Sequence, residues 1–378
     1  MRRDGLIILA LVVLALIWLS VRVHSGAAQM SAQFSGTGLL ATAPESFRRV
    51  TEAVPMSFPA NHALHSGYRN EWWYFTGNLD GPEGERFGYQ FTLFRFALES
   101  TARSDSEFAA DAVWMAHLAL SDGRDERFYQ HERFAREALE LAGATATEWW
   151  LRDWQVTATE SGWLLRAEAE QFALDLMLEP TKPIVLQGDA GYSRKGPEPG
   201  NASRYYSLTR IESFGEVRIQ GQSIPVNGQS WLDREWGSSQ LGEGLDGWDW
   251  FALQLEDGRD LMLYRLRQAD GEASPFSAGA LVEADGSYRI LGAEDFELVP
   301  ARWWRDGQSV EWPLQWQLTV TEPALQFEVR AVFDDQRWNR SVQYWEGMVD
   351  VLEQGAVIGR GYLELSGYAD APGQGRMP

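Results

Sequence analysis

The sequence predicts an all-β protein built from two tandem antiparallel β-barrel domains. Three observations support this fold class: short segments in which apolar and polar residues alternate, an aromatic content of 13%, and a weak internal repeat. Alternation with a period of two is typical of strands with one buried face, and aromatic side chains are favoured in strands. Many short strands at regular spacing indicate sandwiches or barrels. About eight strands in each half would close a barrel wide enough for one small ligand.

The N-terminus has the features of an export signal. Two arginines follow Met1, residues 6–19 are almost wholly apolar, and small residues fill 25–28. This order predicts a secretory signal peptide over residues 1–28. The apolar run continues to about eighteen residues over 6–23, so an uncleaved membrane anchor is the alternative. We therefore expect an exported protein, periplasmic or secreted, with or without membrane anchorage.

The rest of the chain divides into four further segments. Residues 29–60 contain Pro44, Pro55 and Pro59, which indicates an irregular lead-in. The segments that follow are a first barrel over residues 61–240, a second barrel over 241–370 and a flexible tail over 371–378.

Strand patterns in the first half are short and separated by turns. Between Phe87 and Leu93 the apolar residues alternate with Gly88, Gln90 and Thr92, as in a half-buried strand. Further strand candidates are Val113–Leu120, Trp154–Ala158, Trp163–Ala167 and Phe172–Leu178. One stretch, 125–141, has apolar residues at helical spacing and predicts a helix. Residues 180–204 are rich in Gly and Pro and predict a long loop.

The second half repeats the first half in order. Trp73-Tyr-Phe resembles Trp250-Phe-Ala with an offset of 177 residues, Gln171-Phe resembles Gln326-Phe with an offset of 155, and Gln229-Ser-Trp-Leu-Asp resembles Arg360-Gly-Tyr-Leu-Glu with an offset of 131. The offset shrinks by 22 and then by 24 residues, and these shortfalls correspond to the predicted helix and the long loop of the first half. The second half also shows the most regular alternation in the chain, from Trp312 to Val320, which predicts a strand.

Charge and composition exclude several classes of function. The net charge is −21, which opposes binding to the phosphate backbone of nucleic acids and to anionic lipid. The chain has no cysteine, so disulfides, iron–sulfur clusters, thiolate zinc sites, thiol nucleophiles and lipoprotein anchors are excluded.

One stretch concentrates aromatic and acidic residues. Ser230-Trp-Leu-Asp-Arg-Glu-Trp-Gly237 is followed closely by Gly247-Trp-Asp-Trp-Phe251. In an extended chain Trp231, Asp233 and Glu235 share one face, and Leu232, Arg234 and Trp236 share the other. Two interpretations follow. The stretch is a domain joint in which Arg234 pairs with a nearby carboxylate, or it carries a ligand or catalytic site, since buried charge needs a structural or functional reason.

The sequence also resembles a known family. The relevant motifs are His62-x-x-His65, Glu71-Trp-Trp-Tyr-Phe-Thr-Gly77, Phe91-Thr-Leu-Phe-Arg95, Ser230-Trp-Leu-Asp-Arg-Glu-Trp-Gly237 and Trp248-Asp-Trp-Phe251. Together they are similar to the AttH-type secreted lipocalin-like family, which is related to the carotenoid 1,2-hydratases, over roughly residues 50–370. The resemblance implies two lipocalin-like barrels in tandem. It also implies a possible chemistry, since the hydratases add water to a terminal double bond of an acyclic carotenoid without a cofactor.

The residues supply groups for that chemistry. Hydrating an alkene needs a strong proton donor and protection of the carbocation, which a carboxylic acid in an apolar pocket and aromatic faces can provide. The candidate acids are Asp233, Asp249 and Glu235. The candidate ligand-binding residues are Trp72, Trp73, Tyr74, Trp231, Trp236, Trp248, Trp250 and Tyr264. One departure from the hydratases is that Arg265 lies near the place where the resemblance implies an aspartate.

Three functions remain open from the sequence. The first is binding or handling of an apolar small molecule, a lipid or isoprenoid, since aromatic cavities exclude water. The second is a cofactor-free hydratase acting on a carotenoid-like double bond. The third is a carbohydrate-active hydrolase or binding protein, because paired carboxylates and tryptophans suit sugars; the intervening Arg234 argues against it by neutralising its neighbours. As a further partner we consider an export or ABC-transporter system.

The sequence gives little support for a metal site or for a nucleotide-binding site. His62, His65 and His117 could together bind zinc, but structural histidines near a barrel mouth are the preferred interpretation. The Gly-rich run at 242–247 precedes an aromatic strand rather than a helix, and Ser230 lacks the second glycine of a nucleophile elbow. We expect no cofactor and no metal.

Overall fold

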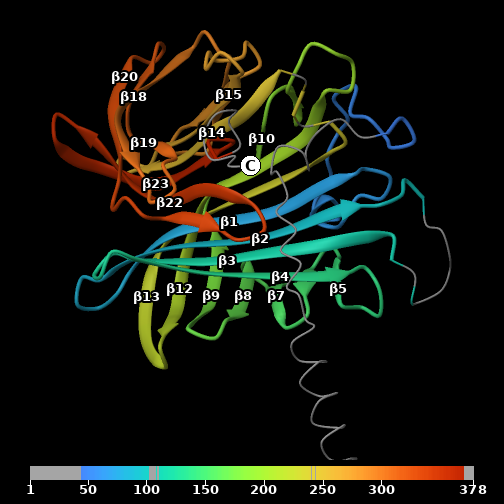
Figure 1. The fold of residues 1–378 in the computed structure, drawn as a ribbon, viewed down its shortest axis with the longest axis horizontal. Helices are drawn as coiled ribbons and strands as arrows, with labels where there is room; N and C mark the ends of the chain where they lie inside the picture. The colour runs from blue at the N-terminus through green and yellow to red at the C-terminus, as the bar shows by residue number, and fades with distance from the viewer. Residues whose placement is uncertain (1–43, 102–107, 109, 240, 243, 370–378) are drawn as a thin grey trace, which may run out of the picture. The chain divides into compact units, whose positions relative to one another are not determined.

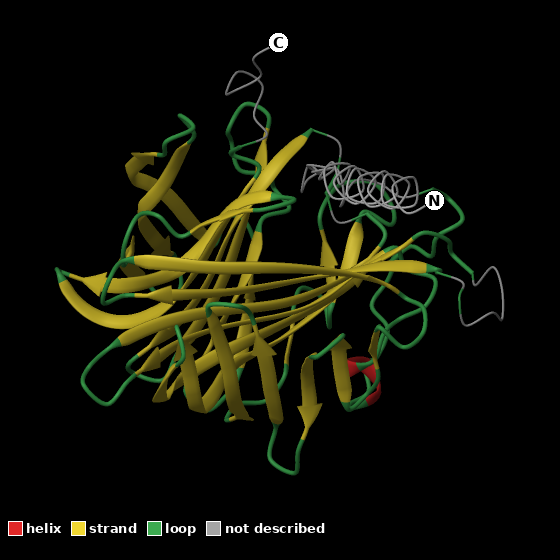
Figure 2. Ribbon diagram, turned by 60° about the horizontal axis from the view of Figure 1, so that its bottom comes forward, coloured by secondary structure: helices red, strands yellow, loops and turns green. Residues whose placement is uncertain are grey.

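Almost all regular structure in the protein is β-strand (Figure 1). The computed structural model describes residues 44–101, 108, 110–239, 241–242 and 244–369. The predicted signal segment, residues 29–43 of the lead-in and the predicted tail lie outside the described residues. Within the described residues the only helix is the short 3-10 turn η1 (Ala60–His62), drawn in red in Figure 2.

The first thirteen strands form one antiparallel sheet, in the order β4-β3-β2-β1-β13-β12-β9-β8-β7-β6-β5, with β10 and β11 paired to β12. Their bounds are β1 Asn70–Asp80, β2 Arg86–Ala97, β3 Ala112–Asp122, β4 Arg127–Arg136, β5 Ala142–Ala144, β6 Glu148–Leu151, β7 Trp154–Ala158, β8 Trp163–Glu168, β9 Phe172–Pro180, β10 Val185–Leu186, β11 Tyr192–Arg194, β12 Ala202–Ile219 and β13 Gln222–Gly237.

The last ten strands form a second antiparallel sheet, in the order β17-β16-β15-β14-β23-β22-β20-β19-β18, with β21 paired to β22. Their bounds are β14 Leu245–Leu255, β15 Asp260–Gln268, β16 Ala278–Val282, β17 Tyr288–Leu291, β18 Phe296–Arg305, β19 Glu311–Val320, β20 Leu325–Ala331, β21 Arg337–Asn339, β22 Gln343–Glu353 and β23 Ala356–Ser366. The predicted all-β fold is confirmed. The sheets curl into a barrel and a half-barrel, consistent with two lipocalin-like barrels (Figure 1).

The two sheets repeat one strand order. Nine consecutive strands of the first sheet, in the order β4-β3-β2-β1-β13-β12-β9-β8-β7, correspond one by one to the nine strands β17-β16-β15-β14-β23-β22-β20-β19-β18 of the second sheet. The offset proposed between Trp73 and Trp250 is wrong by one residue. Tyr74 lies opposite Asp233, and Trp250 lies opposite Glu364, so Tyr74 is the counterpart of Trp250. A shift of one residue exchanges the two faces of a strand. The sequence alignment therefore matched Trp73, whose ring lies in the core of the first sheet, with Trp250, whose ring lies in a cluster outside the cores of the two sheets.

The predicted helix over 125–141 is also wrong, because that stretch forms β4 and the turn after it. Every residue of β4 pairs with β3, and this tertiary pairing overrides the local helical spacing. Phe134 and Leu141, which suggested a helical face, are 40% and 38% exposed. The core contacts of β4 are made instead by Tyr129 and Ala135. The Gly/Pro-rich stretch 180–204 is mostly loop and contributes the short strands β10 and β11.

Strand β13 separates two environments, as its alternation predicts. Leu232 packs in the core of the first sheet, and Arg234 is buried on the same face, paired with Glu71. Trp231 belongs instead to a third cluster of rings, shared by both sheets, that includes Tyr205 of β12 and Trp250 of β14. The stretch is therefore a joint between the two sheets.

A buried ion cluster ties the two sheets at a second place. Asp260, at the start of β15, is fully buried. Its carboxylate accepts hydrogen bonds from Lys182 Nζ at 2.8 Å and from Arg210 Nη2 at 2.6 Å, and both of these residues belong to the first half of the chain. Nearby, Gln254 of β14 donates to the Thr209 carbonyl, so backbone and side chains both cross the joint. The two sheets accordingly belong to one compact unit.

In the part of the chain that the structure describes, no helix has the length and apolarity needed to cross a bilayer.

Candidate functional site

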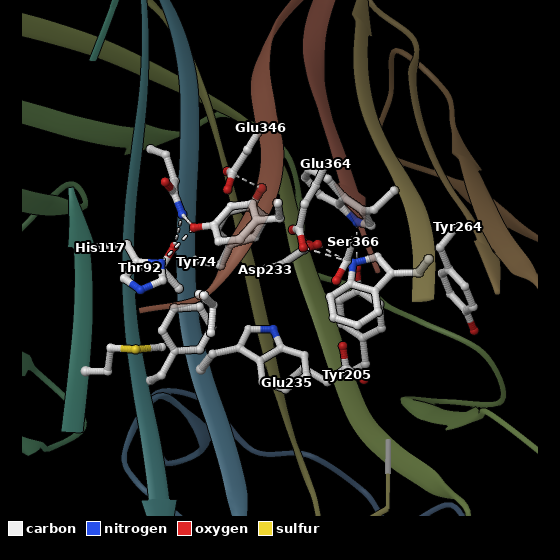
Figure 3. Close-up of a pocket in the computed structure, with 18 of the residues that line it drawn as sticks. Tyr74, Thr92, His117, Tyr205, Asp233, Glu235, Tyr264, Glu346, Glu364 and Ser366 are labelled. Atoms are coloured by element: carbon white, nitrogen blue, oxygen red, sulfur yellow. Dashed lines mark hydrogen bonds between the residues drawn. The ribbon is translucent and has the colours of Figure 1, made fainter. Parts of the chain in front are cut away.

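A cavity of about 140 Å³ lies at the joint between the two sheets (Figure 3). Its wall combines side chains from β1, β2, β3, β12 and β13 with side chains from β14, β15, β22 and β23. An engineered protein cavity of about 150 Å³ accommodates benzene, so this space suits one ring or the end of an apolar chain. Neither sheet forms the cavity alone.

Strand alternation accounts for most of the predicted site residues that reach the cavity; Trp231 is the exception, because it shares the face of Asp233 but does not line the cavity. Those that line it are Trp72, Tyr74, Asp233, Glu235, Trp248, Trp250 and Tyr264. Those that do not are Trp73, Trp231, Trp236 and Asp249. Trp73 points into the first core, Trp231 lies behind Asp233, and Trp236 stacks on His65 at 3.8 Å between ring centroids.

Asp249 lies inside the second barrel rather than at the cavity. It sits between Trp248 and Trp250 in sequence, so the pleat of β14 turns its carboxylate to the opposite face. There it accepts hydrogen bonds from Arg265 Nε at 2.7 Å, Arg267 Nη1 at 2.9 Å and Tyr368 Oη at 2.8 Å. The candidate acid Asp249 is thus a buried ion-pair member, and Arg265 faces it instead of the cavity.

Asp233 lies on the cavity wall with its oxygens fully engaged. Tyr205 Oη donates to it at 2.5 Å, Ser207 Oγ at 2.6 Å and Trp231 Nε1 at 2.8 Å. Burial raises the pKa of Asp233 to about 6, although these three donors act to lower it. A carboxylate held by three donors is well fixed but has little freedom to transfer a proton to a ligand.

Glu235 is neutralised by a lysine that the sequence analysis had not considered. Lys195 Nζ lies 3.4 Å from Glu235 Oε1 and 4.0 Å from the centre of the Tyr264 ring. Burial acts to lower the pKa of Lys195, but Glu235 and Tyr264 outweigh it, so the pKa is raised and the ammonium stays charged. The expectation that Arg234 neutralises its neighbours is wrong, because Arg234 points to the other face of β13.

Two further carboxyl groups face the cavity, and the sequence analysis missed both. Glu346 and Glu364 lie opposite each other on β22 and β23. Tyr74 Oη donates to Glu346 Oε1 at 2.5 Å, and Trp248 Nε1 donates to Glu364 Oε1 at 2.9 Å. The internal repeat aligns Glu364 with Asp233, and this alignment is the sequence signal that could have identified Glu364.

Burial favours the protonated form of both glutamates. It raises the pKa of Glu364 to about 7, with further contributions from the charges of Asp233 and Glu235. Burial also raises the pKa of Glu346 well above its ordinary value, and the charge of Glu364 adds to that effect. Glu364 keeps part of its surface open, whereas Glu346 is buried. The arrangement therefore presents a carboxylic acid to the cavity beside the Trp248 indole.

The histidines considered for zinc do not come together. His62 contacts Tyr206 Oη at 2.6 Å, His65 contacts Glu71 at 2.7 Å, and His117 lies at the cavity near Tyr344. Among the residues that the structure describes, no group of three His, Asp or Glu side chains is placed to hold a metal ion.

The raised pKa of Glu364 gives a testable pH dependence. A carboxyl whose pKa rises from 4.5 to about 7 on folding favours the folded state fully below pH 4.5, and this contribution is lost as the pH rises through about 7. We expect the stability of wild type relative to Glu364→Gln to fall by up to about 3 kcal/mol over that range, because glutamine does not ionise. Urea unfolding of both proteins at several pH values measures it. His62, whose pKa burial lowers to about 4, has an opposite effect in both proteins and cancels in the difference. A constant difference would contradict the prediction.

Comparisons with known proteins bear on both the fold and the site. The model of the AttH-like family matches residues 49–368. A crystal structure of an AttH protein from Nitrosomonas europaea is 35% identical, with a TM-score of 0.77, and the match covers 85% of this chain and 100% of the other. No protein of curated function matches the sequence.

Two more distant structures share the fold. Kievitone hydratase from Nectria haematococca is 13% identical, with a TM-score of 0.61, over 85% of this chain and 98% of its own. CghA, solved with Sch210972, is 11% identical, with a TM-score of 0.50, over 87% of this chain and 98% of its own. At these identities the similarity concerns the fold alone.

Proposed function

The chain belongs to the AttH-like family, and from that premise we propose that it binds an apolar, unsaturated molecule between its two sheets and hydrates a carbon–carbon double bond without a cofactor. One observation carries the proposal. Glu364 presents a carboxylic acid with a pKa of about 7 to a cavity lined by aromatic rings. A proton donor of this kind is most effective when its pKa lies near the working pH.

The site offers what the first step of such a reaction needs. The proton of Glu364 forms a C–H bond to one alkene carbon as the π bond breaks, which leaves a carbocation on the other carbon and a carboxylate on Glu364. The faces of Trp248 and Trp250 line the cavity and can stabilise the cation. Water then bonds to the cationic carbon and releases a proton. Atoms and charge balance, because the alkene gains the elements of water.

The size of the cavity favours a particular class of substrate. A space of about 140 Å³ holds the reacting end of a lipid or isoprenoid, not the whole molecule. The Nectria haematococca protein with the same fold is named a hydratase, which is the same reaction class. A carrier that binds an apolar molecule without turnover is the second candidate, and the rings of the cavity support it equally.

We extend the proposal to location and partners. The pattern of residues 1–28 supports export to the periplasm or beyond, with anchorage by 6–23 as the alternative. An export or ABC-transporter system would then be a partner that delivers or removes the apolar molecule. Fractionation of the source cells, followed by N-terminal sequencing, checks the location.

The binding claim predicts that an apolar molecule accompanies the purified full chain. Organic extraction and mass spectrometry should find a lipid or polyene in stoichiometric amount, or find it after incubation with a mixture of carotenoids and unsaturated fatty acids. Thr92→Phe fills the cavity and should abolish this uptake, because Thr92 is buried on the cavity wall. Thr157→Phe, on β7 and away from the cavity, is the matched control and should retain it. If no apolar molecule is extracted from wild type after the incubation, the apolar-ligand proposal is wrong.

A further inference from the structure

A chain of three side chains runs from the edge of the first sheet into the cavity. Glu132 on β4 lies 3.1 Å, through its Oε1, from His117 Nε2 on β3. His117 Nδ1 in turn lies 2.7 Å from the hydroxyl of Tyr344 on β22. His117 and Tyr344 both line the cavity, and the Glu132 side chain keeps 12% of its surface exposed. None of the three is needed for the proton donation proposed above.

The hydrogen bonds fix the direction of this chain. Burial acts to raise the pKa of Glu132, but hydrogen bonds from His117 and Ser341 outweigh it and lower the pKa, so Glu132 is a carboxylate. A carboxylate only accepts hydrogen bonds, so His117 carries its proton on Nε2 and presents an unprotonated Nδ1 to Tyr344. Tyr344 therefore donates its hydroxyl proton to His117, while Gln90 Nε2 donates to the Tyr344 oxygen at 3.0 Å.

The surroundings of His117 leave Glu132 as its one charged neighbour among the described contacts. The imidazole is fully buried and stacks on Trp338, with ring centroids 4.0 Å apart. Phe94 of β2 packs against its edge at 5.1 Å, and Tyr344 lies beyond Nδ1. Burial lowers the pKa of His117, so the ring is neutral at rest, while the hydrogen bond and charge of Glu132 act to raise that pKa and favour proton uptake. A carboxylate behind a neutral imidazole is the arrangement that strengthens an imidazole as a base.

We infer that Glu132, His117 and Tyr344 form a base relay that takes up the proton released when water adds to the ligand. This inference rests on the proposed hydration. As the water oxygen bonds to the cationic carbon, one of its O–H bonds breaks and that proton passes to the Tyr344 oxygen. The original Tyr344 proton passes at the same time to His117 Nδ1, and Glu132 stabilises the imidazolium. After product release the proton returns through Tyr344 and the cavity to the Glu364 carboxylate, so no outside reagent is consumed.

The donor and the relay reach the cavity from different strands, and Tyr344 pairs with Ser366, two residues from Glu364 on β23. His117 and Thr92 lie at one end of the cavity and Tyr264 at the other, with Glu346 and Glu364 between them (Figure 3). The proton donor comes from β23 of the second sheet, and the relay reaches the cavity from β3 and β22. An acid and a base on separate strands allow one proton to be given and another to be taken during the reaction, and the proton returns to Glu364 only after the product has left. In this scheme Tyr344 is the catalytic residue, and Glu132 is a positioning residue.

The test is the protonation of His117, which needs no substrate. In the full chain labelled with 15N-histidine, nitrogen NMR at neutral pH should show His117 protonated on Nε2 and unprotonated on Nδ1, with its signals assigned by their loss in His117→Gln. Glu132→Ala should shift the proton toward Nδ1, since the acceptor at Nε2 is gone. Glu168→Ala is the control, because Glu168 is a carboxylate on β8 whose ion pair with Arg218 is exposed and lies outside the relay, and it should leave the tautomer unchanged. A proton on Nδ1 in wild type, or a tautomer that ignores Glu132→Ala, overturns the relay.

A kinetic measurement separates this inference from the proposed function. Once a substrate that wild type hydrates has been identified, Tyr344→Phe should lower kcat by about 100-fold or more with KM little changed. The relay alone would be overturned if wild type hydrates a substrate and either His117 carries its proton on Nδ1 or Tyr344→Phe is fully active. No hydration of any carotenoid or unsaturated fatty acid would overturn the proposed function, and the relay with it, whatever the tautomer.

Discussion

Replacing Arg234 by methionine is expected to lower the free energy of unfolding by about 3–5 kcal/mol, because it leaves a buried carboxylate without its partner. The Arg234 side chain is fully buried and pairs with Glu71, which is 1% exposed. Its guanidinium also lies 3.7 Å from the centre of the Trp73 ring and donates to the Ala63 carbonyl at 2.7 Å. Burial acts to raise the pKa of Glu71, yet the charge of Arg234 and the bond from His65 lower it to about 2.

Urea unfolding at neutral pH measures this effect. The control is Arg305→Met, which breaks an ion pair with Glu311 whose side chains are 65% and 43% exposed. Exposed pairs contribute about 1 kcal/mol or less, so the control should stay close to wild type. Two variants with equal stability would show that the buried pair is replaceable by apolar packing.

Glu364→Gln is expected to reduce hydration by about 10²–10⁴-fold while ligand binding stays close to that of wild type. The amide keeps the size of the side chain and can keep the hydrogen bond from Trp248, but it has no proton to give. In wild type kcat should fall as the pH rises through about 7, where Glu364 loses its proton. The residual kcat of Glu364→Gln should not fall as the pH rises through this range. Steady-state kinetics over a pH series, with binding followed by tryptophan fluorescence, checks both statements.

The informative comparison is Asp233→Asn, at the position that the repeat aligns with Glu364. Asp233 accepts hydrogen bonds from three donors, so we expect its replacement to disturb the fold around Tyr205 and Ser207 more than the chemistry. An active Glu364→Gln together with a folded but inactive Asp233→Asn would reverse the two roles.

Much of the fold follows from local pattern, and its failures have a physical origin. The alternation in β13 correctly separates Leu232 and Arg234 from Trp231 and Asp233, because the side-chain period of a strand is fixed. The helix expected over 125–141 fails because its spacing is carried by Phe134 and Leu141, which are exposed, and no single sequence shows that β3 will pair with this stretch.

The candidate site was only partly predictable, for a related reason. Trp248 and Trp250 stand out by residue type, and they do reach the cavity. Glu346 is one of three acids in β22, and only the packing of β22 against β2 shows that it faces a cavity instead of solvent. His117 looked like a structural histidine, since its link to Tyr344 spans 227 residues of sequence.

The buried cluster around Asp260 has a consequence for how the protein loses its structure. Lys182 and Arg210 come from the first half of the chain and Asp260 from the second, so unfolding either half alone would leave buried charges without their partners. Such an unpaired charge costs several kcal/mol, which disfavours a half-unfolded intermediate. We therefore expect the two barrels to unfold together, in one transition, although the architecture is repeated.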